Sequence, residues 1–145
     1  MTKENTSACG LTESDCSYDK RRAVADILSL IGDKWTVMVV AALSYNGVMR
    51  YNEINRQIEG ISQRMLTLTL KGLEQNGLVT RTMYSTIPPR VDYALTELGL
   101  KLVVPLRALY DWAEEHRPEM LASRDAFEDR ERINAPRRAE FYAAK

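Results

Sequence analysis

The chain has 145 residues, of which 45% are apolar, enough for one ordinary globular domain with extra terminal segments. Lys+Arg and Asp+Glu both number 20, so the protein is not a polycation that binds nucleic acid by net charge alone. The charges are unevenly distributed, however. Residues 34–93 carry seven basic and four acidic side chains, which favours an anionic partner for the middle of the chain.

No apolar run reaches the ~18 residues of a membrane span, and the polar N-terminus lacks the pattern of a signal peptide. We therefore expect a soluble, cytoplasmic protein with no membrane partner. Cys9, Cys16 and His116 do not have the spacing of a zinc site, so we expect no metal and no cofactor. The two cysteines do not form a C-x-x-C motif either. A thiol oxidoreductase is therefore the least favoured function, and we expect no enzyme activity.

The first half of the chain predicts an arm followed by three helices. Residues 1–15 are polar and lack periodicity, which predicts a flexible arm. Apolar residues recur at helical spacing between Tyr18 and Gly32, which predicts the first helix. Residues 34–45 are apolar almost all round and predict a helix at the centre of the core. Residues 49–58 predict a third, short helix.

The middle of the chain predicts a capped helix and a two-stranded ribbon. Ser62 is the expected N-cap of a helix that runs to about Asn76, and Gly77 is its expected stop. Two strand candidates, residues 78–85 and 90–95, flank a Pro-Pro loop. A short helix, a capped helix and a two-stranded ribbon in this order predict a winged helix-turn-helix.

The C-terminal part predicts a helical tail. Thr96 begins a long helical segment to about His116, and Pro105 is expected to kink it or divide it in two. Residues 119–132 predict a charged surface helix, within a charged C-terminal helical extension over 116–145. The whole chain therefore predicts a mainly α fold with a small antiparallel β-wing.

The predicted helix after Ser62 has two separate faces. At about 100° per residue its leucines gather on one side, opposite four polar side chains: Gln63, Arg64, Thr67 and Lys71. Gln, Arg and the Thr methyl group suit the edges of adenine, guanine and thymine, whereas Lys71 is better placed for a phosphate. The backbone amides that follow Ser62 also favour a phosphate. The alternative is a surface helix whose polar face is only solvated.

The predicted ribbon adds one further candidate for DNA contact. Arg90 follows the stiff Pro88-Pro89 tip and can enter a minor groove, where a narrow groove strengthens the negative potential. The alternative is an exposed arginine that pairs with Asp92, which contributes little.

Two more basic side chains are candidates for phosphate contacts. Lys34 lies at the expected start of the second helix, and Arg50 lies at the start of the third. The alternative for Arg50 is a local salt bridge with Glu53.

Six segments form an ordered pattern along the chain: Gly32-Asp33-Lys34-Trp35, Arg50-Tyr51-Asn52-Glu53-Ile54, Gly60-Ile61-Ser62, Leu73-Glu74-Gln75-Asn76-Gly77-Leu78-Val79, Pro88-Pro89-Arg90-Val91-Asp92-Tyr93 and Leu95-Thr96-Glu97-Leu98-Gly99. This pattern resembles the HxlR-type family of bacterial transcriptional regulators, which is related in fold to the MarR-type winged-helix proteins. The resemblance implies a winged helix-turn-helix domain over residues 16–115, including N- and C-terminal dimerisation helices. It also implies a homodimeric, sequence-specific regulator, expected to be a repressor, whose two recognition helices enter successive major grooves of a pseudo-palindromic operator in double-stranded DNA.

The resemblance further implies that Cys16 occupies the position of an N-terminal cysteine that senses oxidants or electrophiles in several family members. The basic residues 20–22 favour a reactive thiolate, whereas Asp15 and Asp19 oppose one. Ser17 also departs from the family, which usually has proline there. Cys16 is thus a redox-sensing candidate, and an inert thiol is the alternative.

Three further departures are mild: Asp33 replaces the usual glycine, Tyr51 the usual phenylalanine and Asp92 the usual glutamate. Two alternatives to the main hypothesis stay open. The inducer can be a small non-covalent ligand instead of an oxidant. The whole chain can instead be a winged-helix protein-interaction module, which its neutral net charge permits.

Overall fold

The structure is a computed structural model that describes residues 18–143, with side chains described over 20–135. Its elements follow in the order α1 (Tyr18–Ile31), α2 (Lys34–Asn46), β1 (Met49–Arg50), α3 (Tyr51–Gln57), α4 (Gln63–Gln75), β2 (Val79–Tyr84), β3 (Arg90–Leu95) and α5 (Glu97–Ala143). The predicted class, mainly α with a small antiparallel sheet, is confirmed. By its internal contacts the chain divides between Val103 and Val104 into two compact units.

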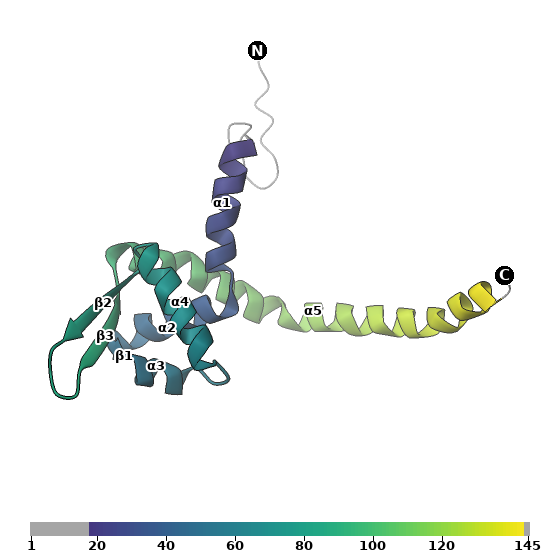
Figure 1. Ribbon diagram of the computed structural model, residues 1–145. Coiled ribbons are helices and arrows are strands. Elements are labelled where there is room, and N and C mark those ends of the chain that lie inside the picture. Colours follow the sequence, from purple (N-terminus) through teal and green to yellow (C-terminus); the bar gives the residue numbers. More distant parts are fainter. Residues whose placement is uncertain (1–17, 144–145) are drawn as a thin grey trace, which may run out of the picture. The chain divides into compact units, whose positions relative to one another are not determined.

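The core of the first unit forms around α2. Asp33 caps this helix, because its Oδ2 accepts the N–H groups of Trp35 (3.1 Å) and Thr36 (3.2 Å). Val39, Val40 and Leu43 are fully buried. Figure 1 shows α2, α3 and α4 gathered beside the sheet. The prediction of a central helix over residues 34–45 is therefore confirmed.

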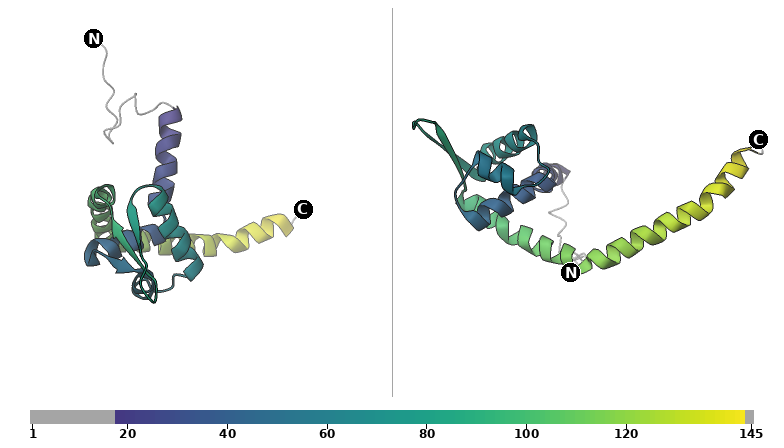
Figure 2. Two further views of the ribbon diagram at one scale, coloured as in Figure 1. Left: turned by 60° about the vertical axis from the view of Figure 1, so that its left-hand side comes forward. Right: turned by 90° about the horizontal axis from the view of Figure 1, so that it is seen from below.

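The sheet has three antiparallel strands in the order β1-β3-β2. The β2–β3 ribbon pairs Val79 with Leu95 at one end and Tyr84 with Arg90 at the other, and Figure 2 shows it projecting beyond the helices of this unit. The prediction of only two strands was incomplete. β1 pairs Met49 with Tyr93, but a strand of two residues has no periodicity of its own and was included in the third predicted helix.

The α4 helix begins and ends as predicted. Ser62 Oγ accepts the N–H of Met65 (3.1 Å), and Gly77 has φ 69°, a conformation that favours glycine after a helix. One side of α4 is anchored in the core by three buried leucines: Leu66, Leu70 and Leu73. This apolar face fixes which side of α4 meets the solvent.

The first turn of α5 is tied to the chain segment that follows α4. The Thr96 backbone N–H donates to the Leu78 carbonyl (3.0 Å), and Thr96 Oγ1 donates to the Gly77 carbonyl (2.6 Å). Thr96 Oγ1 also accepts the Gly99 N–H (3.1 Å), which makes Thr96 the predicted N-cap. A Cβ at Gly99 would lie 2.2 Å from the Leu78 carbonyl oxygen, so only glycine fits at this close approach.

The described part of the second unit, residues 104–143, is the remainder of α5. The helix runs unbroken through Pro105 and Pro118. Of the two outcomes expected at Pro105, a kink or a division, the division is therefore wrong, and so is the separate helix over 119–132. Each proline removes only its own N–H donor, and the remaining helical residues keep the helix intact. His116 is therefore not at a helix end. Its Nδ1 lies 2.9 Å from the Trp112 carbonyl oxygen, and its ring stacks on the Trp112 ring.

No single helix in the described part of the chain is long and apolar enough to cross a membrane. Only residues 20–31 of α1 together with α2, a pair bent by 66°, reach the length and composition of a span. Within all the described residues, no group of three or more His, Cys, Asp and Glu side chains could hold a metal ion.

Candidate nucleic-acid interface

The polar face of α4 points to solvent, as the sequence predicted. Its N-cap and four polar residues are all exposed: Ser62, Gln63, Arg64, Thr67 and Lys71. Among the residues that the structure describes, the side chains of Gln63, Arg64 and Lys71 form no hydrogen bond or ion pair. Their donors and acceptors are therefore available to a partner outside the chain.

Thr67 differs from its neighbours on this face, because its hydroxyl group already has partners. Thr67 Oγ1 donates to the carbonyl oxygen of Gln63 (2.8 Å) and lies 3.0 Å from the hydroxyl of Tyr51. The Tyr51 hydroxyl also donates to the Gln63 carbonyl (2.8 Å). Sequence reasoning missed this contact between α3 and α4, and the only signal for it was tyrosine in place of the usual phenylalanine.

The arginine of the ribbon is held by a carboxylate. Arg90 Nε and Nη2 donate to Asp92 Oδ1 (2.8 Å) and Oδ2 (2.6 Å), and the guanidinium lies 5.0 Å from the centre of the Tyr84 ring. The two side chains face each other because residues i and i+2 of a strand share one face. Asp92 is only 6% exposed, against 43% for Arg90. The ion pair that the sequence left as the alternative is thus present, and a DNA contact by Arg90 has to compete with it.

This ion pair shifts the pKa of both partners. The hydrogen bond from Arg90 lowers the pKa of Asp92 and outweighs burial, which acts in the opposite direction; the charges of Arg90 and Arg50 lower it further. The hydrogen bond to Asp92 in turn raises the pKa of Arg90. Asp92 therefore stays ionised at neutral pH and gives the middle of β3 a negative charge beside two arginines.

The two remaining candidates for phosphate contacts lie on elements other than α4. Arg50 stands opposite Asp92 in the β1–β3 ladder, and its backbone N–H donates to Glu53 Oε2 (2.7 Å). Glu53 thus caps α3, and the described side chains show no Arg50–Glu53 salt bridge. The Lys34 ammonium lies 4.2 Å from the centre of the Trp35 ring, close to the start of α2. Cys16, the redox candidate, lies outside the described residues.

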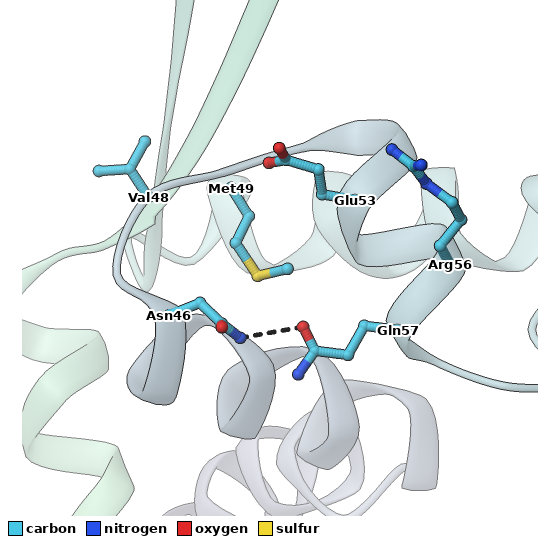
Figure 3. Close-up of a pocket in the computed structure, with 6 residues that line it drawn as sticks. All are labelled: Asn46, Val48, Met49, Glu53, Arg56 and Gln57. Atoms are coloured by element: carbon cyan, nitrogen blue, oxygen red, sulfur yellow. Dashed lines mark hydrogen bonds between the residues drawn. The ribbon is translucent and has the colours of Figure 1, made fainter.

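A shallow hollow lies where α2, β1 and α3 meet (Figure 3). It is lined by six residues: Asn46, Val48, Met49, Glu53, Arg56 and Gln57. A hydrogen bond from Asn46 Nδ2 to Gln57 Oε1 (2.9 Å) closes one side. Its lining is mixed and mostly polar, unlike the apolar cavities that hold most small ligands. The hollow therefore gives no support for an effector site.

Comparisons with known proteins agree with this geometry. A family model described as HxlR-like helix-turn-helix matches residues 30–120. Over 100 residues, the chain is 39% identical to YtfH of Escherichia coli (strain K12), an uncharacterised HTH-type transcriptional regulator; the match covers 69% of this chain and 79% of YtfH.

Two solved structures share the fold. The YtfH structure from Salmonella typhimurium, described as that of a transcriptional regulator, aligns with a TM-score of 0.64 at 35% identity and covers 70% of this chain and 90% of that one. The redox regulator HypR in its reduced form aligns with a TM-score of 0.63 at 37% identity, and the alignment covers 69% of this chain and 98% of HypR. The family model, the relative and the shared winged-helix fold together show that this chain belongs to the HxlR-like helix-turn-helix family of DNA-binding transcriptional regulators.

Proposed function

We propose that the protein binds an operator in double-stranded DNA as a homodimer, with α4 in the major groove, and represses transcription there. The exposed polar face of α4 carries this proposal. It presents uncommitted Gln and Arg side chains on a helix whose opposite face is fixed by buried leucines. A helix held rigidly in this way fits the geometry by which helix-turn-helix proteins read base edges.

Each residue of this face has a role in the proposal. Arg64 reads guanine and Gln63 reads adenine, each through two hydrogen bonds, and Lys71 contacts a phosphate one turn further along. The first backbone N–H groups of α4, which have no acceptor within the helix, bind a second phosphate next to Ser62. Thr67 offers its methyl group to thymine.

Three basic side chains outside α4 extend the contact. Lys34 and Arg50 each bind a phosphate. Arg90 enters the adjacent minor groove when the negative potential of DNA competes successfully with Asp92. These contacts position the protein and add salt-dependent affinity.

Exposed apolar side chains on α1 support a dimer. Val24, Ile27 and Leu28 are three and four residues apart on one side of the helix, and each is more than half exposed. Leu98 and Leu100 in the first turn of α5 are similarly exposed. Monomeric proteins seldom expose so much apolar surface, so the proposed functional domain, residues 16–115, includes helices that pair with a second copy. Residues 116–145 form its charged C-terminal extension.

A salt titration of DNA binding tests the proposal. Operator sites are first selected from random duplexes, and binding is then measured by fluorescence anisotropy between about 50 and 200 mM salt, where phosphate contacts produce a steep slope. We expect tight, salt-dependent binding of the selected site by a protein that sediments as a dimer. Absence of a salt slope would instead indicate a protein-interaction module.

We also propose that oxidation of Cys16 switches the protein in the cytoplasm. The similarity to HypR, described as a redox regulator, supports this regulation. Mobility shifts of the protein–DNA complex before and after diamide, in the parent and in Cys16→Ser, test it. We expect diamide to alter binding by the parent only. A lack of response in both proteins would indicate a non-covalent inducer.

A further inference from the structure

Three oxygen atoms from α3 and α4 form a closed cluster beside the proposed reading face. They are the Tyr51 hydroxyl, the Gln63 carbonyl oxygen and Thr67 Oγ1, and the three distances between them are 2.8, 2.8 and 3.0 Å. Tyr51 is the first residue of α3 and is half-buried, whereas Gln63 and Thr67 lie one turn apart on the exposed side of α4. The cluster therefore joins the two helices of the helix-turn-helix at the edge of the proposed DNA contact.

The hydrogen atoms of this cluster restrict what Thr67 can offer. A carbonyl oxygen only accepts, and each of the two hydroxyl groups has a single proton to donate. The Thr67 proton is directed to the Gln63 carbonyl or to the Tyr51 oxygen, and the Tyr51 proton to one of the other two oxygens. With its proton used inside the protein, Thr67 has no donor left for a base and presents its methyl group.

We propose that Tyr51 is a specificity-determining residue of this regulator: its hydroxyl group holds the Thr67 hydroxyl, so that Thr67 selects the methyl group of thymine at one base pair of each half-site. This inference rests on the proposed function of α4. Without the Tyr51 hydroxyl, Thr67 keeps only the hydrogen bond to the Gln63 carbonyl of its own helix, and its hydroxyl can turn from there to a base. Because a hydroxyl group can pair with several bases, the preference at that base pair broadens.

The test compares Tyr51→Phe, which removes one hydroxyl group, with Tyr45→Phe. Tyr45 is 89% exposed, and within the described residues its hydroxyl group makes no hydrogen bond, so it is a matched control. Anisotropy is measured at fixed salt on the selected operator and on duplexes that carry each substitution at each base pair of a half-site. We expect Tyr51→Phe to lower the discrimination for thymine at one position by about two- to tenfold, and Tyr45→Phe to leave every preference as in the parent.

A second variant, Thr67→Val, distinguishes a role of Tyr51 in positioning Thr67 from a role in the stability of the whole domain. In Thr67→Val the side chain keeps its methyl group and a second methyl group replaces the hydroxyl, so Tyr51→Phe should have no further effect on base preference there. A purely structural role would instead lower the denaturation midpoint and change no preference. The same shift in the Thr67→Val background, or an unchanged profile for Tyr51→Phe, overturns the inference while leaving the proposed function intact. Failure of the parent to discriminate any sequences overturns both.

Discussion

The recognition helix and the wing hold their arginines in opposite ways. On α4, three buried leucines fix the helix, and the exposed Arg64 has no partner among the described residues. In the ribbon, every residue of β2 after Val79 is exposed, and Arg90 is bound to Asp92 and lies over Tyr84. The α4 helix is held by buried leucines, so the Arg64 charge stays available to a partner. In the ribbon, the Arg90 charge is instead used in an ion pair within the protein.

The largest expected effect concerns the anchoring of α4. Leu70→Ala removes a buried side chain and should lower the free energy of unfolding by about 2–5 kcal/mol. Urea denaturation monitored by circular dichroism measures this loss. Leu68→Ala is a matched control on the same helix, because Leu68 is 53% exposed and its loss should change stability by less than about 0.5 kcal/mol. Equal effects of the two would refute the anchoring.

The next effect concerns the availability of the two arginines. Arg64→Ala should weaken binding to the selected operator by about 1–3 kcal/mol and relax its specificity, because a bidentate contact to guanine is lost. Arg90→Ala should cost less, since the parent must break the pair with Asp92 before this arginine reaches DNA. Anisotropy on the operator and on random duplex measures both. If Arg90→Ala lowers the affinity for the operator as much as Arg64→Ala or more, the proposed difference in availability between the two arginines is wrong.

A smaller effect is expected at Lys71. Lys71→Ala should weaken binding to all sequences alike and reduce the slope of log K against log salt by about 1, as expected for one lost phosphate contact. Lys71→Arg, which keeps the charge, is the matched control. A selective loss at one base pair would assign Lys71 to base reading instead.

The smallest effect concerns the charge held in the wing. The pKa of Asp92 is lower in the folded than in the unfolded protein, so its carboxylate stabilises the fold. This stabilisation is complete above the unfolded-state pKa of about 3.9 and is lost as the pH falls through the lower folded-state pKa. Acid should therefore destabilise the parent more steeply than Asp92→Asn, whereas Asp92→Glu should keep the dependence. Asp92→Asn should also raise the salt slope, by less than about 1, because Arg90 is released. Urea denaturation at several acidic pH values and salt titrations measure these changes, and parallel pH profiles of parent and Asp92→Asn would count against the pair.

The parts that sequence predicted best depend on local rules. The faces of α4 follow from the helical period, and its ends follow from Ser62 and Gly77, all within one segment of chain. Two residues of β1 are too few to show a strand period, so that strand emerges only from its pairing with β3. α5 continues past Pro105 because the helix-forming residues on both sides outweigh the loss of one N–H donor. A rule that considers the proline alone does not include the contribution of those neighbours.

The candidate site was predicted as a set of side chains but not as a set of contacts. Exposure of the α4 face followed from periodicity, whereas the partners of Thr67 and Arg90 depend on how separate elements meet. Tyr51 is sixteen residues from Thr67 along the chain, and no local pattern signals their contact. For Arg90 the spacing to Asp92 allowed both a minor-groove contact and an ion pair, and only the structure shows that the ion pair forms.

The close approach at Gly99 has a mechanical consequence. Thr96 is bonded to the carbonyl groups of Gly77 and Leu78, directly after the end of α4, and Gly99 lies against the same Leu78 carbonyl with no space between them. Rotation or sliding of the start of α5 must therefore pull the end of α4 along or break both hydrogen bonds. The contact thus couples the two helices mechanically, so that a displacement of the start of α5 is transmitted to the end of α4.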